Sequence, residues 1–298
     1  MGTVIRSASR RLTSSRVFRI AGRRVTVGSI LFWGVGMLLA VFWMWPFFWM
    51  VSTSLKPERE ILSLIPEWLP REHTWRNYER VFAFPVLRWY WNSFVVAIVS
   101  TLLILLLNSL AGYAFARINF FGRNVLFVLV LTTLMMPFEA LVIPLFIMMS
   151  LFQFGNTYFA LIAPGLASAF GVFLFRQFFL SLPSDLEDAA RIDGCGRWGI
   201  YWRIALPLAQ PAVIALAILH FIGNWNSLFW PLIITNTDAV KTLPVGMLMF
   251  RPGFGADQSW AHGLAMAAAT IQALPPLIVF FILQRYFMQG IATVGLKG

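Results

Sequence analysis

The sequence predicts an all-α integral membrane protein with six transmembrane helices and both termini on the cytoplasmic side. Of the 298 residues, 59% are hydrophobic and 12% are charged, against about 25% charged residues in soluble domains. Apolar stretches of about 20 residues, long enough to cross the hydrocarbon core, recur along the chain. Basic residues gather in alternate segments between these stretches. These observations exclude a soluble enzyme and a disordered chain, and the single cysteine, Cys195, excludes an internal disulfide.

The net charge of +11 comes mainly from the start of the chain. Seven arginines and no acid lie within the first 24 residues, in a tail of residues 1–27 that meets the first apolar stretch. A basic tail beside a span keeps its end of the chain in the cytoplasm. The rest of the chain offers no soluble basic face, so no nucleic-acid binding is expected.

The basic residues also set the expected topology of residues 28–298. With the N-terminus inside, 15 Lys and Arg residues fall in inner segments and 8 in outer ones. Six of those eight lie in an external loop, 52–88, whose five glutamates lead us to expect a small folded segment. A second external loop covers 236–262, and a cytoplasmic tail covers 288–298. The six spans are expected at residues 28–51, 93–115, 125–151, 158–175, 211–235 and 263–287.

The third span is expected to be broken. Pro137 and Pro144 each remove a backbone donor, and Glu139 lies between them. Broken helices persist at membrane depth where they are buried in protein or line a cavity. An acid at that depth is a candidate functional residue, and the alternative is a structural role as a cap beside Pro137.

The inner segment 183–207 predicts two short helices joined by a glycine turn. Ser184 and Glu187 have capping-box spacing, so a helix is expected to begin at Ser184 and to end at Gly194. Acidic side chains crowd its first turn, where the helix dipole favours them. A second helix is expected from about Arg197 to Ala205, stopping before Pro207. From the pattern alone, an amphipathic loop at the membrane interface is an equally good interpretation.

This segment resembles the EAA loop of ABC-importer permease subunits. Asp188-Ala189-Ala190, then Gly194, then Ile204-Ala205-Leu206-Pro207 follow that pattern, with Asp188 in place of the usual glutamate. The resemblance covers about residues 30–298 and is closest to the carbohydrate branch, the maltose and glycerol-phosphate type. Further matches to that branch are Asn156-Thr157-Tyr158, Trp225-Asn226 with Trp230-Pro231-Leu232, Met136-Pro137 with Ile143-Pro144-Leu145, and the end of the chain from Gly290.

The resemblance implies the type I importer permease (MetI-like) fold and a set of partners. These are a second permease, expected to make a heterodimer, two ATP-binding subunits, and an external solute-binding protein. The chain lacks a G-x-x-x-x-G-K-[ST] phosphate loop, so ATP and Mg are expected to be used by the partner ATPase subunits and no cofactor by this chain. The residues implied to couple it to the ATPase are Glu187, Asp188, Ala189, Ala190, Asp193, Gly194 and Pro207.

Two further groups of residues are candidates for function. Along the translocation path they are Glu139, His220, Asn224 and Asn226, whose polar groups suit a sugar but equally suit hydrogen bonds between helices. In the resembling branch the second external loop faces the binding protein, which makes Gly253, Phe254 and Gly255 the candidate contact.

The main alternative class is a secondary transporter of a small polar solute that uses Glu139. Such a protein is expected to bury further ionisable groups and to carry inverted repeats, and we see neither in the sequence. An intramembrane enzyme needs a Ser/His, Asp/Asp or metal constellation within the spans, and none is visible. We therefore expect no catalytic residue and no metal site, in a multi-pass protein of the plasma or inner membrane.

Overall fold

A computed structural model describes the chain over residues 17–20, 23–63, 65, 67–251 and 261–295. These residues are helical apart from turns and one antiparallel hairpin, β1 (Val17–Ile20) and β2 (Arg23–Thr26). The hairpin lies in the expected basic tail and is the departure from an all-α chain in the described part. Its β-branched and aromatic residues favour strands. The spans themselves are helical, as expected.

Three helices are long and apolar enough to cross a membrane unbroken. They are α1 (Val27–Ser54), α4 (Val86–Arg117) and α15 (Ala261–Gly295), which agree with the first, second and sixth expected spans. The helix α4 begins seven residues earlier than expected, at Val86 instead of residue 93. The helix α15 continues to Gly295, so most of the expected C-terminal tail 288–298 is helical.

Three further candidate spans are pairs of helices bent at a short break. The first pair joins α5 (Arg123–Thr132) and η1 (Thr133–Met135) to α6 (Phe138–Leu151) at an angle of 101°. This is the break expected in the third span. It falls at Met136, because a residue before proline avoids the helical region and Pro137 has no N–H to donate. Counting each pair as one span gives six in the described residues.

The fourth span is also broken, where a continuous helix was expected. α7 (Tyr158–Ile162) and η2 (Ala163–Gly165) meet α8 (Ala169–Ser181) at 49°. The hydroxyl of Ser168 accepts a hydrogen bond from the Gly171 N–H at 3.2 Å and so begins a new helix. The span also extends six residues past the expected end, from 175 to Ser181.

The expected fifth span, 211–235, is two helices. α12 (Gln210–Trp225) ends at Trp225, and α13 (Phe229–Ile234) follows after a turn. At the other end α12 is bent by 73° against the helix that precedes it. The apolar composition runs through both helices and concealed the turn at Asn226 in the sequence.

The helix α4 is the centre of the packing, with α8 and α12 against it. Glycines permit the close approach of α4 and α8. A Cβ on Gly112 would lie 2.5 Å from the Phe175 Cβ, and one on Gly171 would lie 2.7 Å from the Asn108 Nδ2. Both distances are shorter than side chains tolerate, so larger residues would force the helices apart. Small residues at such crossings are typical of membrane helices.

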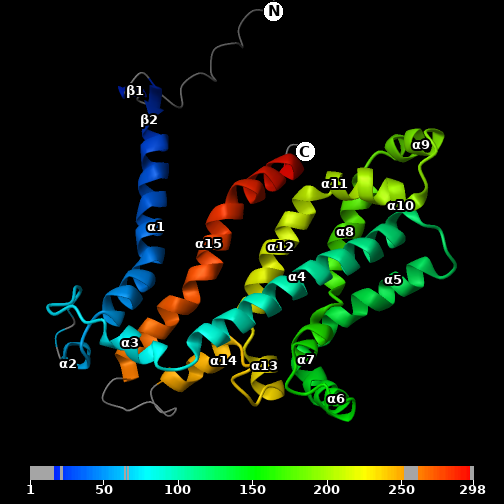
Figure 1. The fold of residues 1–298 in the computed structure, drawn as a ribbon. Coiled ribbons are helices and arrows are strands. Elements are labelled where there is room, and N and C mark those ends of the chain that lie inside the picture. Colours follow the sequence, from blue (N-terminus) through cyan, green and yellow to red (C-terminus); the bar gives the residue numbers. More distant parts are fainter. Residues whose placement is uncertain (1–16, 21–22, 64, 66, 252–260, 296–298) are drawn as a thin grey trace, which may run out of the picture.

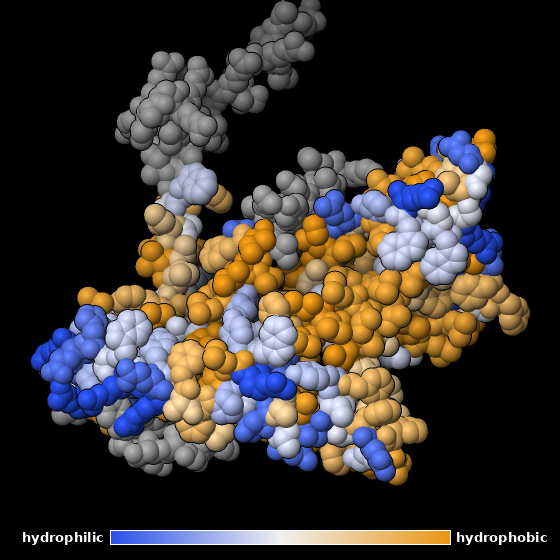
Figure 2. All heavy atoms as spheres, viewed as in Figure 1, coloured by the Kyte–Doolittle hydropathy of each residue, from blue (hydrophilic) through white to orange (hydrophobic). Residues whose placement is uncertain are grey.

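Short helices and turns lie at two opposite ends of the molecule (Figure 1). One end carries the short helices α2 (Glu58–Ile61), α3 (Arg76–Phe82) and α14 (Leu243–Met247), with η4 (Leu248–Phe250) after α14. The other carries the segment 183–208 and the hairpin (Figure 1). On the face of the molecule that Figure 2 shows, apolar residues cover most of the surface between the two ends. This arrangement fits a membrane-spanning chain.

The expected small folded segment within 52–88 is present. Glu58 is buried, and its carboxylate accepts hydrogen bonds from the N–H groups of His262 (3.2 Å) and Gly263 (3.1 Å). A carboxylate at the start of a helix satisfies unpaired N–H groups and the helix dipole. Asn77 on α3 is fully buried and donates to the carbonyl groups of Ser54 and Lys56. The segment is therefore fixed to the ends of α1 and α15.

Candidate functional site

The segment expected to couple the chain to an ATPase forms the predicted helix, turn and helix. The first helix, α9 (Ser184–Ile192), ends in a turn where Gly194 has φ +83°, a conformation that side chains with a Cβ rarely adopt. The Gly194 N–H donates to the Arg191 carbonyl at 3.0 Å, and the Cys195 N–H donates to the Ala190 carbonyl at 2.8 Å. These two bonds form a Schellman motif, which satisfies the last carbonyls of α9. Gly194 is thus required by the backbone.

The expected capping box is absent. The helix begins at Ser184 as expected, but Ser184 is its first helical residue and Pro183 occupies the cap, with no side-chain hydrogen bond to the helix. Glu187 points elsewhere and is buried, with a relative exposure of 6%. The spacing was correct for a capping box, and the proline at the cap position prevented it.

Glu187 joins α9 to α4 instead. Its Oε1 lies 3.3 Å from the Nε of Arg117, in the last turn of α4, and the two side chains are 8% and 14% exposed. Arg117 also donates to the carbonyls of Phe179 (Nη2 to O 2.6 Å) and Leu182, at the end of α8. Arg191 pairs with Glu187 and Asp188 from the exposed side. Arg117 therefore holds α4, α8 and α9 together. This role was not expected from the sequence, because its partners lie far from it along the chain.

The second helix is longer and less regular than expected. It comprises α10 (Arg197–Ile200), a π-helical turn η3 (Tyr201–Ala205) and α11 (Leu206–Leu208). It does not stop before Pro207, because the π-helical turn has already shifted the hydrogen-bond register there and Pro207 falls in the first turn of α11. The Tyr201 hydroxyl lies 2.7 Å from the Ser109 hydroxyl, which ties this helix to α4.

One face of the helix pair is packed and the other is exposed. Ala190, Ile200 and Tyr201 are buried in a cluster with residues of α4, α8 and α12. Ala189 is exposed, so only one of the two expected alanines contributes to the outer surface. Apolar side chains on the outer face are Leu186, Ile192 and Trp198, exposed by 43%, 87% and 65%; the acids Asp188 and Asp193 are exposed beside them. Arg191 and Arg197 are exposed as well, so the face is apolar with an edge of mixed charge. It lies at one end of the molecule (Figure 1).

The expected path residues lie on two different elements. Glu139 is exposed in the first turn of α6, where a carboxylate is favourable to the helix dipole. His220 and Asn224 lie one turn apart on α12. The His220 Nε2 and the Asn224 Nδ2 are buried without a hydrogen-bond partner among the described residues. Buried polar atoms of this kind are rare and need an explanation.

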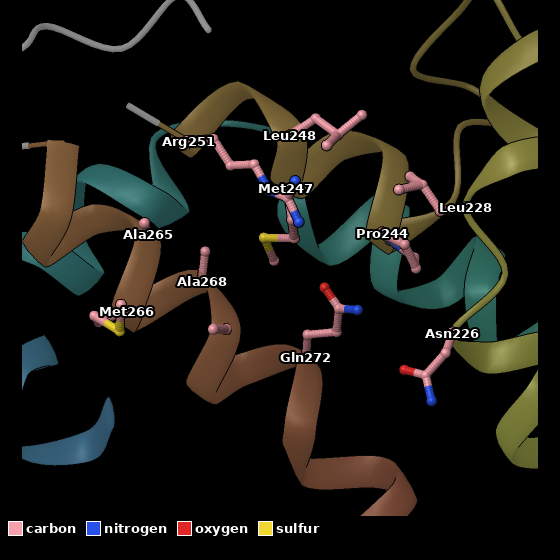
Figure 3. A pocket seen from close by; sticks show the side chains of 11 residues that line it. Asn226, Leu228, Pro244, Met247, Leu248, Arg251, Ala265, Met266, Ala268 and Gln272 are labelled. Atoms are coloured by element: carbon pink, nitrogen blue, oxygen red, sulfur yellow. The ribbon is translucent and has the colours of Figure 1, made fainter. Parts of the chain in front are cut away.

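Asn226 lies in a different place, at a cavity of about 410 Å³ (Figure 3). The cavity is formed by the turn after α12, by α14 and η4, and by the first half of α15. The Gln272 side chain reaches into it from α15, and Arg251 reaches over it from the end of η4. Asn226 was expected from the sequence, whereas Arg251 and Gln272 were not.

A proline and a tryptophan fix Gln272 in position. In a regular helix the Gln272 carbonyl accepts from the N–H of residue 276, but Pro276 has none. The indole N–H of Trp225, which is fully buried, donates to this carbonyl instead at 3.0 Å. This bond joins the end of α12 to α15 at the floor of the cavity. The role of Trp225 in the Trp225-Asn226 pair is therefore structural.

The Asn156-Thr157-Tyr158 motif is also structural. The Asn156 side chain holds residues 236 and 237 by hydrogen bonds to their N–H groups, of 2.9 and 3.2 Å. Thr157 caps α7 by accepting from the Ala160 N–H, and the Tyr158 hydroxyl donates to Asn92. Asn92 is fully buried and donates to the carbonyls of residues 239 and 241. The motif and Asn92 together fasten the segment 236–242 onto α4 and α7.

Asp238 strengthens the same attachment. Its hydrogen bonds with Lys241, 2.8 Å away, and with the indole N–H of Trp89, 3.1 Å away, hold the pKa of this carboxyl below its usual range. The expected binding-protein contact Gly253, Phe254 and Gly255 lies outside the described residues. The structure does describe the two ends of that loop, Arg251 and His262.

Comparisons with known proteins identify the family. Residues 108–293 match the family model described as "Binding-protein-dependent transport system inner membrane component". The chain is 39% identical over 266 residues to the arabinooligosaccharides transport system permease protein AraQ of Halalkalibacterium halodurans, covering 87% of this chain and 92% of that protein. It is 33% identical over 264 residues to the sn-glycerol-3-phosphate transport system permease protein UgpE of Yersinia enterocolitica, covering 86% and 92%.

A solved structure shares the fold. It is the crystal structure of a bacterial ABC transporter involved in the import of the acidic polysaccharide alginate, with a TM-score of 0.77, 23% identity, and coverage of 88% of this chain and 96% of that one. The expected importer-permease fold is confirmed. The chain therefore belongs to the family of binding-protein-dependent transport system inner membrane components and is a multi-pass permease subunit of an ABC importer.

Proposed function

We propose that this permease forms half of the translocation path for a carbohydrate or a related solute, such as an oligosaccharide, a sugar alcohol or a glycerol-phosphate compound. The names of its relatives support this class, since they cover arabinooligosaccharides, lactose and sn-glycerol-3-phosphate. An external binding protein delivers the solute, and two separate ATP-binding subunits drive its passage. This function takes the place of the alternative secondary transporter that uses Glu139.

The observation that carries the proposal is the exposed face of α9 and α10. It presents apolar side chains beside charged ones of both signs, while Arg117 and Ser109 of α4 hold its inner side. Exposed apolar residues rimmed by polar ones mark protein contacts. Movement of an ATPase that binds this face is transmitted to the spans through the Arg117–Glu187 ion pair and the hydrogen bond between Ser109 and Tyr201. The coupling residues are accordingly Glu187, Asp188, Ala189, Ala190, Asp193, Gly194 and Pro207, with Arg117 added.

The arrangement of the two ends supports the proposed topology. The segment 183–208, the hairpin of the basic tail and the last turns of α15 lie toward one end, and α2, α3 and α14 lie at the other (Figure 1). With both termini inside, α9 and α10 face the cytoplasm, and the cavity and the loop 236–262 face the binding protein. Positive-inside orientation follows from the seven arginines of the tail.

The second permease covers surface that is open in the single chain. None of the most apolar part of α1 is buried within this chain. The buried atoms of His220 and Asn224 have no partner in the described part of it. We assign His220, Asn224 and Glu139 to the path between the two permeases, where they meet the solute, water or the sister subunit.

Purification of the tagged chain from native membranes in mild detergent tests the proposed function. We expect a phosphate-loop ATPase and a second permease in stoichiometric amounts, and an ATPase activity that the loaded binding protein stimulates. A stable chain recovered without an ATPase contradicts the proposal and turns attention to Glu139.

A further inference from the structure

The cavity at the outer end of α15 has the form of a small-molecule site. Its volume of about 410 Å³ lies within the roughly 300–1,000 Å³ of known ligand pockets. Ala265, Ala268 and Ala269 open this space on one face of α15, and Gln272 closes the same face one turn further on. The amide of Gln272 and that of Asn226, from the end of α12, meet the cavity from different sides (Figure 3).

The charge of the lining is the informative feature. Among the described residues that line the cavity, Arg251 is the one with a formal charge. No ion pair or side-chain hydrogen bond of Arg251 is found within residues 17–251 and 261–295 where these are described. Arginine binds carboxylate, sulfonate and phosphate groups through its planar fork of donors. An arginine over a cavity whose described lining residues include no acid is suited to an anionic ligand.

The amide side chains and the apolar residues of the lining suit the rest of a carbohydrate. Asn226 and Gln272 each offer donors and an acceptor, which suit the hydroxyl groups of a carbohydrate. Met247, Met266 and Leu228 supply the apolar surface against which the C–H face of a sugar ring can pack. The Trp225 bond to the Gln272 carbonyl keeps this part of the site in place before a ligand binds.

We infer that this cavity binds an anionic carbohydrate, with Arg251 on its acidic group and Asn226 and Gln272 on its hydroxyl groups. The inference rests on the proposed function, because it takes the solute to arrive from the binding protein on this side. It narrows the solute class from carbohydrates in general to those that carry a carboxylate, sulfonate or phosphate.

The first test identifies the solute. The native binding protein is purified without added sugar, and the solute that stays bound is identified by mass spectrometry. We expect an acidic carbohydrate. A neutral sugar or polyol overturns the inference but leaves the proposed function intact, whereas the absence of any ATPase and binding protein overturns the proposed function.

The second test uses variants of the complete importer in proteoliposomes with that solute as the probe. Arg251→Gln is expected to raise the KM for uptake by about tenfold or more, since it removes a charge-assisted contact. Arg251→Lys retains the charge and should show a smaller rise, and Gln272→Met a rise of severalfold. Arg59→Gln, which removes an exposed arginine from the same end of the molecule, is the matched control and should leave the KM unchanged.

A third variant separates solute binding from an internal ion pair. Asp257 lies in the segment after Arg251. If Arg251 served to hold that segment, Asp257→Asn would reproduce the rise in KM of Arg251→Gln, and this result would overturn the inference. An unchanged KM in Arg251→Gln would also overturn the inference.

Discussion

Gly194 shows how one residue can set the geometry of the segment proposed to couple the chain to an ATPase. Its left-handed backbone costs a residue with a Cβ about 1–2 kcal/mol, and more for a β-branched one. No atom lies within 4 Å of the position a Cβ would take, so the cost is conformational and not steric. A substitution therefore changes the angle between α9 and α10 without disturbing the core.

For this reason Gly194→Val is expected to reduce solute transported per ATP hydrolysed severalfold, while the permease still assembles in the membrane. Gly194→Asn is the matched control, because asparagine tolerates this conformation. Transport and ATP hydrolysis are measured together in proteoliposomes. A normal transport ratio in Gly194→Val would show that the turn has no coupling role.

Arg117 and Glu187 carry the second prediction at this scale. Both are largely buried, and loss of one partner removes the buried opposite charge from the other. Glu187 then keeps its contact with the more exposed Arg191, and Arg117 keeps its hydrogen bonds to carbonyl groups. Arg117→Gln is expected to cost about 3 kcal/mol or more of stability, which lowers the thermal unfolding temperature of the detergent-purified complex. Arg117 also donates hydrogen bonds to two carbonyl groups at the end of α8. Arg117→Gln should therefore lower the stability by more than Glu187→Gln does.

The double variant Arg117→Gln, Glu187→Gln provides the control, because it removes both charges at once. The stability that the double variant loses should be less than the sum of the losses of the two single variants. Additive losses would mean that the two side chains do not interact in the protein.

At the scale of elements, prolines and their partners explain the irregular helices. Pro137 breaks the third span as the sequence predicts. Pro276 lies within α15 and does not break it, because the indole N–H of Trp225 replaces the missing backbone donor. It donates a hydrogen bond to the Gln272 carbonyl. A proline in an apolar stretch thus predicts a defect in the hydrogen-bond ladder, and the surrounding helices decide whether the helix ends.

Trp225→Phe tests this account of α15. It leaves the Gln272 carbonyl buried without a donor, and we expect a loss of about 1–3 kcal/mol in addition to the smaller ring volume. In a Pro276→Ala background residue 276 has a backbone N–H that can donate to the Gln272 carbonyl. Trp225→Phe should therefore lower the free energy of unfolding by a smaller amount in that background. Thermal unfolding of the four proteins forms a double-mutant cycle. Equal costs in both backgrounds would contradict the compensation.

At the scale of the whole molecule, the sequence predicts the class of fold and the location of most spans. Apolar runs long enough to cross the membrane give α1, α4 and α15, and Pro137 gives the broken third span. The breaks at residues 166–168 and 226–228 were missed, because a new helix can begin within an apolar stretch, as it does at the Ser168 cap of α8, without a change in apolar composition. Hydropathy measures burial in lipid and does not register such bonds.

The sequence predicts the parts of the candidate site that depend on local pattern and misses the contacts between distant segments. The helix, glycine turn and helix of the coupling segment follow from local sequence. The link from Glu187 to Arg117 crosses 70 residues of chain, and the cavity joins Asn226, Arg251 and Gln272 from three segments. Contacts of that kind have no local pattern. The Ser184 capping box failed because Pro183 took the cap position.

The central claim is that α9 and α10 bind an ATPase on their exposed face. Ile192→Cys places a thiol at the most exposed apolar position of this face, with Cys195→Ser removing the native thiol. The account predicts a cross-link from residue 192 to a phosphate-loop ATPase in native membranes, with a yield that changes when ATP is bound. A cysteine at Trp68, exposed at the opposite end, should give none. A cross-link from Trp68→Cys to the ATPase, or none from Ile192→Cys in membranes where the importer is active, would contradict it.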